Sequence, residues 1–87
     1  MSKKLEEEIL LRLKKNLIEI TEISKSKITK NSIFKNDLGM DSLDRLELGY
    51  RIEEDFSIPL SDGDMLNKFE TLGDYVDYIL AQKRYKE

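Results

Sequence analysis

Apolar residues recur at intervals of three and four positions through the first quarter of the chain, and lysine and glutamate fill most positions between them. This spacing places the apolar side chains on one face of a helix. It predicts one long amphipathic helix over about residues 3–23. The apolar positions that define the face are Leu5, Ile9, Leu10, Leu13, Leu17 and Ile20.

Residues 24–40 lack this periodicity and are rich in serine, lysine, threonine and asparagine, which favour turns and loops. We expect a long first loop that ends near Gly39. A loop of this length in a compact domain is typically functional or contains a short turn of helix. The apolar residues expected to anchor it to the core are Ile28, Ile33, Phe34 and Leu38.

A second helix is predicted over about residues 42–56. Asp41 and Ser42 are both preferred at the start of a helix, and carboxylates in the first turn complement the positive end of the helix dipole. Pro59 disfavours the helical conformation at the residue before it, so the helix has to end near Phe56.

Two further helices complete the predicted fold. Ser61 can cap a short helix over about residues 61–67, which Gly63 weakens. Thr71 and Asp74 have the spacing of a capping box, and the apolar residues after them trace one face of a last helix over about residues 71–83. The expected fold class is all-α: a small four-helix bundle with a long first loop and a short third helix, formed by residues 1–87 as a single domain.

The predicted second helix has apolar residues on two opposite faces. A bundle of 87 residues has little material to cover both of them. We expect the second face to remain exposed beside acidic residues, as in a protein docking site, whereas the alternative is a helix that is buried all round. The first face comprises Leu48, Ile52 and Phe56, within about 80° on a helical wheel, and the second comprises Leu43, Leu46 and Tyr50, within about 60°.

The composition excludes several kinds of chemistry. The sequence has no cysteine, histidine or tryptophan, so disulfides, thiol nucleophiles, imidazole bases and Cys/His zinc sites are ruled out. Asp41 and Asp44 are paired carboxylates, but nothing in the sequence indicates a water-excluding cleft that would shift their pKa values for acid and base catalysis. We therefore expect no enzyme, no catalytic residues and no dedicated metal site, with divalent cations bound at most loosely among Asp37, Asp41 and Asp44.

Charge is distributed unevenly behind a net value of −3. Residues 36–78 hold twelve acidic and three basic residues, a net charge of −9, whereas residues 1–35 carry a net charge of +4. Such an acidic surface repels nucleic acid and attracts basic proteins, although a merely solvated face is the simpler interpretation. Neither a signal peptide nor a membrane span is recognisable, so we expect a cytoplasmic monomer that does not insert into membranes.

Ser42 has two possible roles. Its position alone favours a simple helix cap. Its neighbours form an ordered set, namely Phe34, Asp37-Leu38-Gly39-Met40-Asp41-Ser42-Leu43-Asp44, Glu47-Leu48, Ile52-Glu53-Glu54-Asp55-Phe56, Ile58-Pro59 and Asp77-Tyr78-Ile79. This set resembles the acyl carrier protein family over nearly the whole chain.

The resemblance implies that 4′-phosphopantetheine is attached covalently to Ser42 and holds acyl groups as thioesters for fatty-acid biosynthesis. A separate phosphopantetheinyl transferase attaches this arm in the family, and acyl-chain synthesising or transferring enzymes with basic docking patches bind the acidic helix. The recognition residues carried over from the family are Asp41, Leu43, Asp44, Leu46, Glu47, Tyr50 and Glu54. The residues that would line an acyl pocket, or simply form core, are Phe34, Leu48, Ile52, Ile58 and Leu66.

Three residues depart from the family pattern. Arg45 and Arg51 place positive charge in a helix that the family usually keeps acidic, and Tyr50 is bulkier than the usual aliphatic residue. The segment 60–70 is also longer than usual. Two alternatives therefore stay open: a specialised carrier of aminoacyl or other lipid-pathway cargo, and an unmodified helical protein-interaction module in which Ser42 is only a cap.

Overall fold

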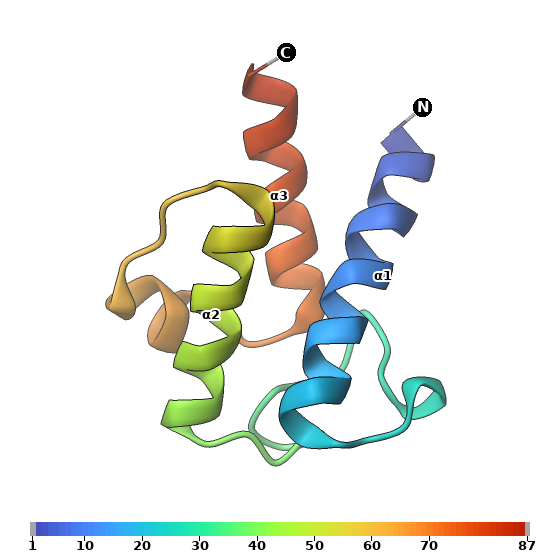
Figure 1. Cartoon of the computed structure of the whole chain (residues 1–87), viewed down its shortest axis with the longest axis vertical. Helices are drawn as coiled ribbons and strands as arrows, with labels where there is room; N and C mark the ends of the chain where they lie inside the picture. The colour runs from blue at the N-terminus through green and yellow to red at the C-terminus, as the bar shows by residue number, and fades with distance from the viewer. Residues whose placement is uncertain (1, 87) are drawn as a thin grey trace.

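Between residues 2 and 86 the chain forms three α-helices, one 3-10 turn and one π-helical turn (Figure 1). The structure is a computed structural model that describes the backbone of residues 2–86 and the side chains of residues 4–82. No strand occurs in the described backbone, and the predicted all-α fold class is confirmed. The elements are α1 (Ser2–Thr21), η1 (Lys25–Lys27), α2 (Ser42–Phe56), η2 (Asp64–Lys68) and α3 (Leu72–Lys86).

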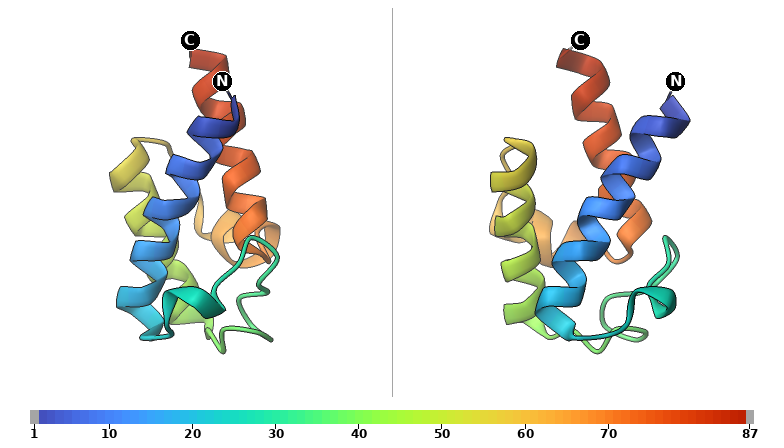
Figure 2. Two further views of the ribbon diagram at one scale, coloured as in Figure 1. Left: turned by 90° about the vertical axis from the view of Figure 1, so that its right-hand side faces the viewer. Right: turned by 45° about the vertical axis from the view of Figure 1, so that its right-hand side comes forward.

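The long helices surround one apolar core, in which α1 packs against both α2 and α3. The two ends of the chain lie at one end of the bundle, whereas the loop between α1 and α2 crosses the opposite end, where α2 begins (Figures 1 and 2). The side chains at the centre of the core are Leu13 and Leu17 from α1, Leu48 and Ile52 from α2, and Leu72, Val76 and Ile79 from α3.

α1 ends at Thr21, two residues before the predicted end. Glu22 adopts a left-handed φ of 63°, which interrupts the helix. The Thr21 hydroxyl donates to the Leu17 carbonyl at 2.8 Å and accepts the Ile23 N–H at 3.2 Å, so it satisfies backbone groups at this end. The apolar pattern continues past the helix because Ile23 packs against the core from the loop.

The long first loop is anchored by the buried side chains of Ile28, Phe34 and Leu38. The expectation that Ile33 is a further anchor is wrong, because its side chain is 36% exposed. Ile33 instead pairs through its backbone with Thr71 in an isolated antiparallel bridge. This bridge joins the loop to the start of α3, and the Phe34 N–H donates to the carbonyl of Glu70 at 2.9 Å beside it.

The short third helix has an irregular form. Residues 62–63 are helical and lead into the π-helical turn η2, which ends at Lys68, one residue beyond the predicted limit. Ser61 caps this segment, since its hydroxyl accepts the Asp64 N–H at 3.1 Å. Met65 is the fully buried side chain of η2 and packs on Gly49 of α2.

α3 starts at a capping box, as its sequence predicts. The Thr71 hydroxyl accepts the Asp74 N–H at 3.2 Å, and an Asp74 carboxylate oxygen accepts the Thr71 N–H at 3.1 Å. The helix then runs to Lys86, three residues beyond the predicted end. Neither glycine nor proline occurs after Gly73, so nothing in the sequence stops the helix earlier.

Candidate functional site

α2 begins with a capping box that does not involve Ser42. Asp41 is the N-cap residue: its Oδ1 accepts the backbone N–H of Asp44 at 2.9 Å, and Oδ2 of Asp44 accepts the backbone N–H of Asp41 at 3.4 Å. Two backbone donors at the helix start are thereby satisfied. Ser42 occupies the first helical position, so the interpretation of Ser42 as the cap of α2 is wrong.

The Ser42 side chain is exposed to solvent. None of the hydrogen bonds found in the described part of the chain involves its hydroxyl. The chain reaches this position through Gly39, whose φ of 62° lies in the left-handed region that glycine adopts without a steric penalty. Met40, which is buried, then fixes the turn against the core and leaves the serine outside.

The start of α2 can accommodate a phosphate group on Ser42. The N–H groups of Ser42 and Leu43 lie in the first turn, and the side-chain and loop hydrogen bonds of the described residues leave both without an acceptor. Unpaired N–H groups and the positive end of the helix dipole stabilise anions at this position. An exposed hydroxyl beside these donors therefore fits a covalently attached phosphodiester.

Leu43, Leu46 and Tyr50 form an apolar strip on the outside of α2, which we call the outer strip. Leu43 is 75% exposed, Tyr50 is 50% exposed and Leu46 is half-buried. The alternative in which α2 is buried all round is therefore wrong. Acidic residues accompany the strip along the helix: Asp41, Glu47 and Glu54 are exposed, and Asp44 is half-buried.

The segment after α2 is tied back to the helix by two hydrogen bonds. The Tyr50 hydroxyl donates to Oδ1 of Asp62 at 2.9 Å, and this bond raises the pKa of Tyr50. Oε2 of Glu53 accepts the backbone N–H of Leu60 at 2.7 Å. The bulky Tyr50 thus contributes an exposed ring to the outer strip and also holds the start of the short third helix.

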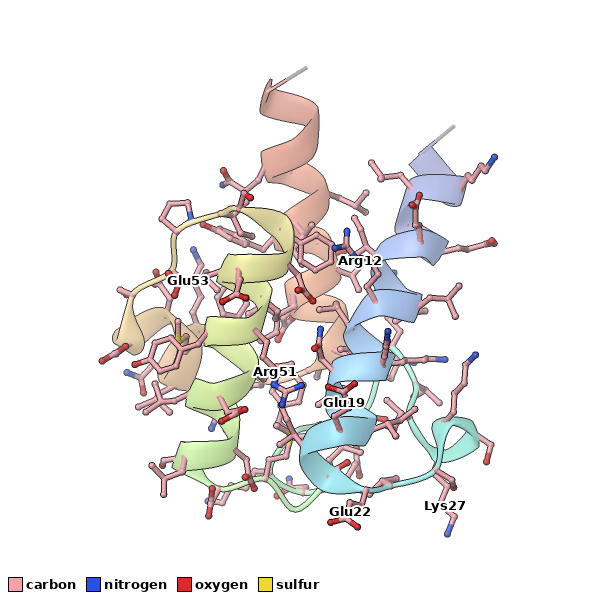
Figure 3. The ribbon with its side chains drawn as sticks, viewed as in Figure 1. Arg12, Glu19, Glu22, Lys27, Arg51 and Glu53 are labelled. Atoms are coloured by element: carbon pink, nitrogen blue, oxygen red, sulfur yellow. The ribbon has the colours of Figure 1, made fainter. Side chains whose placement is uncertain are left out.

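Arg51 links α2 to α1. Its guanidinium pairs with Glu19 of α1 and, at 3.1 Å, with Glu47 one turn earlier on α2. Figure 3 shows the Arg51 side chain directed towards Glu19 across the gap between the two ribbons. Its charge is therefore engaged within the fold, with two carboxylates as partners.

Arg45 links α2 to the short third helix. Its Nη2 donates to the carbonyl of Leu66 at 2.6 Å and to the carbonyl of Phe69 at 2.9 Å. Both arginines that depart from the family pattern are thus used in internal contacts, and the outer strip keeps its acidic surroundings.

Four of the five residues predicted to line an acyl pocket are core residues: Phe34, Leu48, Ile52 and Ile58 are each at most 3% exposed. Leu66 is only half-buried, and its neighbour Met65 takes the buried position. A separate pocket of about 190 Å³ lies beside the start of α2. Its lining residues are Ile33, Lys35, Asn36, Arg45 and Glu70.

The carboxylates near Ser42 accept hydrogen bonds from the backbone. Oδ2 of Asp37 accepts the backbone N–H of Ile33 at 2.8 Å, and Asp41 and Asp44 are engaged in the capping box. Across the described residues, no group of three or more acidic side chains is arranged to hold a metal ion.

The sequence did not predict that two polar groups are buried. Nε of Arg45 and the Tyr75 hydroxyl are both buried, and neither finds a hydrogen-bond partner among the described residues. Tyr75 fits the apolar face of the last helix and gives no sign of a polar role in the sequence. The sequence analysis noted the positive charge of Arg45 in an acidic helix, but it gave no sign that Nε of this residue is buried.

Comparison with known proteins agrees with this geometry. The family model for the phosphopantetheine attachment site matches residues 12–79. The acyl carrier protein of Treponema pallidum (strain Nichols) is 41% identical over 76 residues, which cover 87% of this chain and 96% of the relative. That of Lactobacillus acidophilus is 39% identical over 78 residues, which cover 90% and 96%. A solved structure of the acyl carrier protein from Enterococcus faecalis superposes with a TM-score of 0.72 at 33% identity and covers 87% of this chain and 95% of that one.

An exposed serine at the start of an acidic helix in a small helical bundle, together with these matches, defines a phosphopantetheine-bearing carrier domain. The chain belongs to the acyl carrier protein family, and the resemblance stated from the sequence is confirmed. Its cofactor is 4′-phosphopantetheine, and the members of this family are carrier proteins. Among the described residues, no helix has both the length and the apolar character needed to span a membrane.

Proposed function

We propose that this protein carries acyl groups as thioesters on a 4′-phosphopantetheine arm joined to Ser42, for fatty-acid biosynthesis. The observation that supports this most is the division of roles at the start of α2: Asp41 caps the helix, so the exposed Ser42 hydroxyl has no structural task. The arm supplies the thiol that a chain without cysteine lacks.

Attachment of the arm is a phosphoryl-group transfer from coenzyme A. The Ser42 oxygen forms a bond to the phosphorus nearest the pantetheine, the bond to the bridging pyrophosphate oxygen breaks, and 3′,5′-ADP leaves. The hydroxyl proton passes to a base on the phosphopantetheinyl transferase, while Asp41 and Asp44 of this chain keep their hydrogen bonds to the backbone at the start of α2. This chain contributes an accessible hydroxyl and a helix start that stabilises the resulting phosphodiester.

The outer strip and its acidic residues are the proposed recognition surface. Leu43 and Tyr50 offer exposed apolar contact area, and Glu47 and Glu54 provide negative charge that steers basic surfaces towards it. The partners on this account are the transferase and acyl-chain synthesising or transferring enzymes with basic docking patches. We expect the carrier to act as a monomer that binds no nucleic acid and inserts into no membrane, and its cytoplasmic location stays a prediction from the sequence.

Intact mass spectrometry tests the proposal. The unmodified protein is incubated with coenzyme A and a broad-specificity phosphopantetheinyl transferase, and the mass should rise by one 4′-phosphopantetheine group. The Ser42→Ala variant should show no increase. Ser61→Ala is the matched control, because Ser61 is also an exposed serine at a helix start but is used as a cap. An unshifted wild-type mass, as an unmodified interaction module would give, contradicts the proposal.

A further inference from the structure

A groove of about 410 Å³ lies beside α1 and η1, apart from the start of α2. Most of its lining residues recur along α1 at steps of three and four positions, so they form one stripe of the helix. With a rise of about 1.5 Å per residue, the stripe extends over roughly 10 Å, or about two turns. The lining residues are Leu11, Lys14, Lys15, Ile18 and Glu19 of α1, and Lys25 of η1.

The groove and the surface of α1 that contacts α2 lie on different sides of the helix. At about 100° per residue, the middle of the stripe lies about 150° from the core residue Leu13. Arg12 and Asn16, which both hydrogen-bond to Asp55 of α2, lie on the opposite flank of the helix. The groove and the outer strip therefore belong to different faces of the bundle.

The groove combines exposed apolar surface with positive charge. Leu11 is 53% exposed, and Ile18 is half-buried. Lys15 and Lys25 are exposed, and Lys14 is half-buried. None of the ion pairs found between the described residues involves these three lysines. Apolar contact area with charge at its edges is what a protein-binding surface offers.

The acidic residue that lines the groove is already paired. Glu19 forms an ion pair with Arg51 of α2, and Figure 3 shows the two side chains directed towards each other. Residues 1–35 as a whole carry a net charge of +4, whereas residues 36–78 carry −9. The charge of the groove therefore favours an acidic occupant, the opposite of the basic partners that the outer strip attracts.

An amphipathic helix of another protein matches both the shape and the charge. Such a helix inserts apolar residues at steps of three, four and seven positions into a groove. The outer strip of this chain has acidic and apolar residues on a helix, but a second copy seated through it would make a head-to-tail contact that propagates into a ring or a filament. It would also occupy the strip that partner enzymes need. A different protein is therefore the better occupant.

We propose that the groove is a second docking site, which binds an acidic amphipathic helix of a partner protein. The apolar face of that helix covers Leu11 and Ile18, and its carboxylates pair with Lys14, Lys15 and Lys25. A protein bound here leaves the outer strip uncovered, so it can hold the carrier while an enzyme acts on the arm. The inference does not depend on attachment of the arm, because α1 and η1 of the unmodified chain form the groove.

Titration of the unmodified, nitrogen-15-labelled protein with a designed helical peptide tests the position and the charge of the site. The peptide carries leucines along one face and glutamates beside them, and a second peptide has lysine in place of each glutamate. The amide signals of Leu11, Lys15 and Ile18 should shift with the acidic peptide and stay in place with the basic one. Absent shifts, shifts confined to other residues, or equal shifts with both peptides overturn the proposal.

Two charge reversals on the same helix give a matched comparison. Lys15→Glu should weaken binding of the acidic peptide about fivefold or more at low salt, because a repulsion replaces an attraction. Lys4→Glu makes the same change at an exposed position outside the groove, and it should weaken binding less than about twofold. Equal losses in the two variants would indicate a general attraction between opposite net charges and would overturn the site.

Photocrosslinking in the cells that make the protein identifies the occupant. p-Benzoylphenylalanine replaces Leu11 in one sample and Leu43 of the outer strip in another, and the crosslinked peptides are sequenced. At position 11 we expect an acidic segment with apolar residues at helical spacing, from a protein other than the carrier. A synthetic copy of that segment should bind the wild-type protein and lose affinity for the Lys15→Glu variant.

The remaining results count against the site. Crosslinking at position 11 to lipid, to a second copy of the chain or to the same segments as at position 43 overturns the proposal, and so does the absence of any crosslinked protein. Attachment of the arm to Ser42 is measured separately by intact mass. A failure of the groove therefore leaves the proposed carrier function standing, and an unmodified Ser42 leaves the groove standing.

Discussion

Asp41 and Asp44 accept each other's backbone N–H groups at the start of α2, and the serine between them takes no part in capping. Helix stability and cofactor attachment are thereby assigned to different residues. The serine can be exposed and modified because the structure of the helix start does not depend on its hydroxyl.

This division of roles predicts the stability of two variants. Asp41→Ala should lower the free energy of unfolding by about 1 kcal/mol, because a backbone donor loses its cap. Ser42→Ala should change it by less than about 0.5 kcal/mol, as for an exposed residue without partners. Urea unfolding of the unmodified proteins measures both values. A loss for Ser42→Ala as large as that for Asp41→Ala would show that the serine is part of the cap after all.

Gly49 and Gly63 should respond in opposite ways to alanine. A Cβ at Gly49 would overlap the Met65 side chain, so Gly49→Ala should destabilise by about 1 kcal/mol although alanine favours helix. Gly63 has a helical φ of −62°, and its nearest neighbour would be the Ser61 hydroxyl at 3.8 Å. Gly63→Ala should therefore stabilise by about 0.5 to 1 kcal/mol. Thermal unfolding checks both signs, and stabilisation by Gly49→Ala would refute the close packing of η2 on α2.

The two arginines of α2 should differ in their contribution to stability. Arg45→Met removes charge-assisted hydrogen bonds to two carbonyls at a half-buried site and should cost about 2 kcal/mol. Arg51→Met removes partly exposed ion pairs and should cost about 1 kcal/mol or less. Amide hydrogen exchange in η2 should accelerate only in the Arg45 variant because, of the two arginines, only Arg45 donates hydrogen bonds to the carbonyls of Leu66 and Phe69. Equal exchange in both variants would contradict this role.

Substitutions on the outer strip should weaken the docking of partner enzymes without affecting the folding of the carrier. Leu43→Ala should leave the free energy of unfolding nearly unchanged, because Leu43 is 75% exposed. It should lower kcat/KM of the transferase about tenfold, which corresponds to the loss of a moderate interface contact. Glu54→Lys should lower kcat/KM most at low salt, and Glu7→Lys, an exposed acid on α1, should not. Equal effects of the two charge reversals would exclude a specific recognition face.

The sequence was sufficient to predict the parts of the fold that depend on repeated local signals. The stripe from Leu5 to Ile20 extends over several turns, and the limits of α2 follow from a capping residue before it and Pro59 after it. The exposure of Leu43 and Tyr50 also followed, because a small bundle cannot cover both apolar faces of one helix. Ser42 was located by its neighbours, since the residue type alone fits many helix starts.

The remaining features depend on contacts between distant segments. Ile33 turns outward because its backbone pairs with Thr71, and no local pattern indicates that pairing. Met65 replaces Leu66 in the interior because the π-helical turn changes which side chains face α2. Asp41 and Ser42 are both good caps by type, so only the geometry distinguishes them.

The most direct measurement of the central claim is the location of the added group in the modified protein. Trypsin cleaves after Lys35 and Arg45 and releases residues 36–45, a peptide in which Ser42 is the only residue with a hydroxyl side chain. The account predicts that tandem mass spectrometry finds the whole of the added 4′-phosphopantetheine on this peptide, at Ser42. An unmodified peptide, or the group on any other residue, would contradict it.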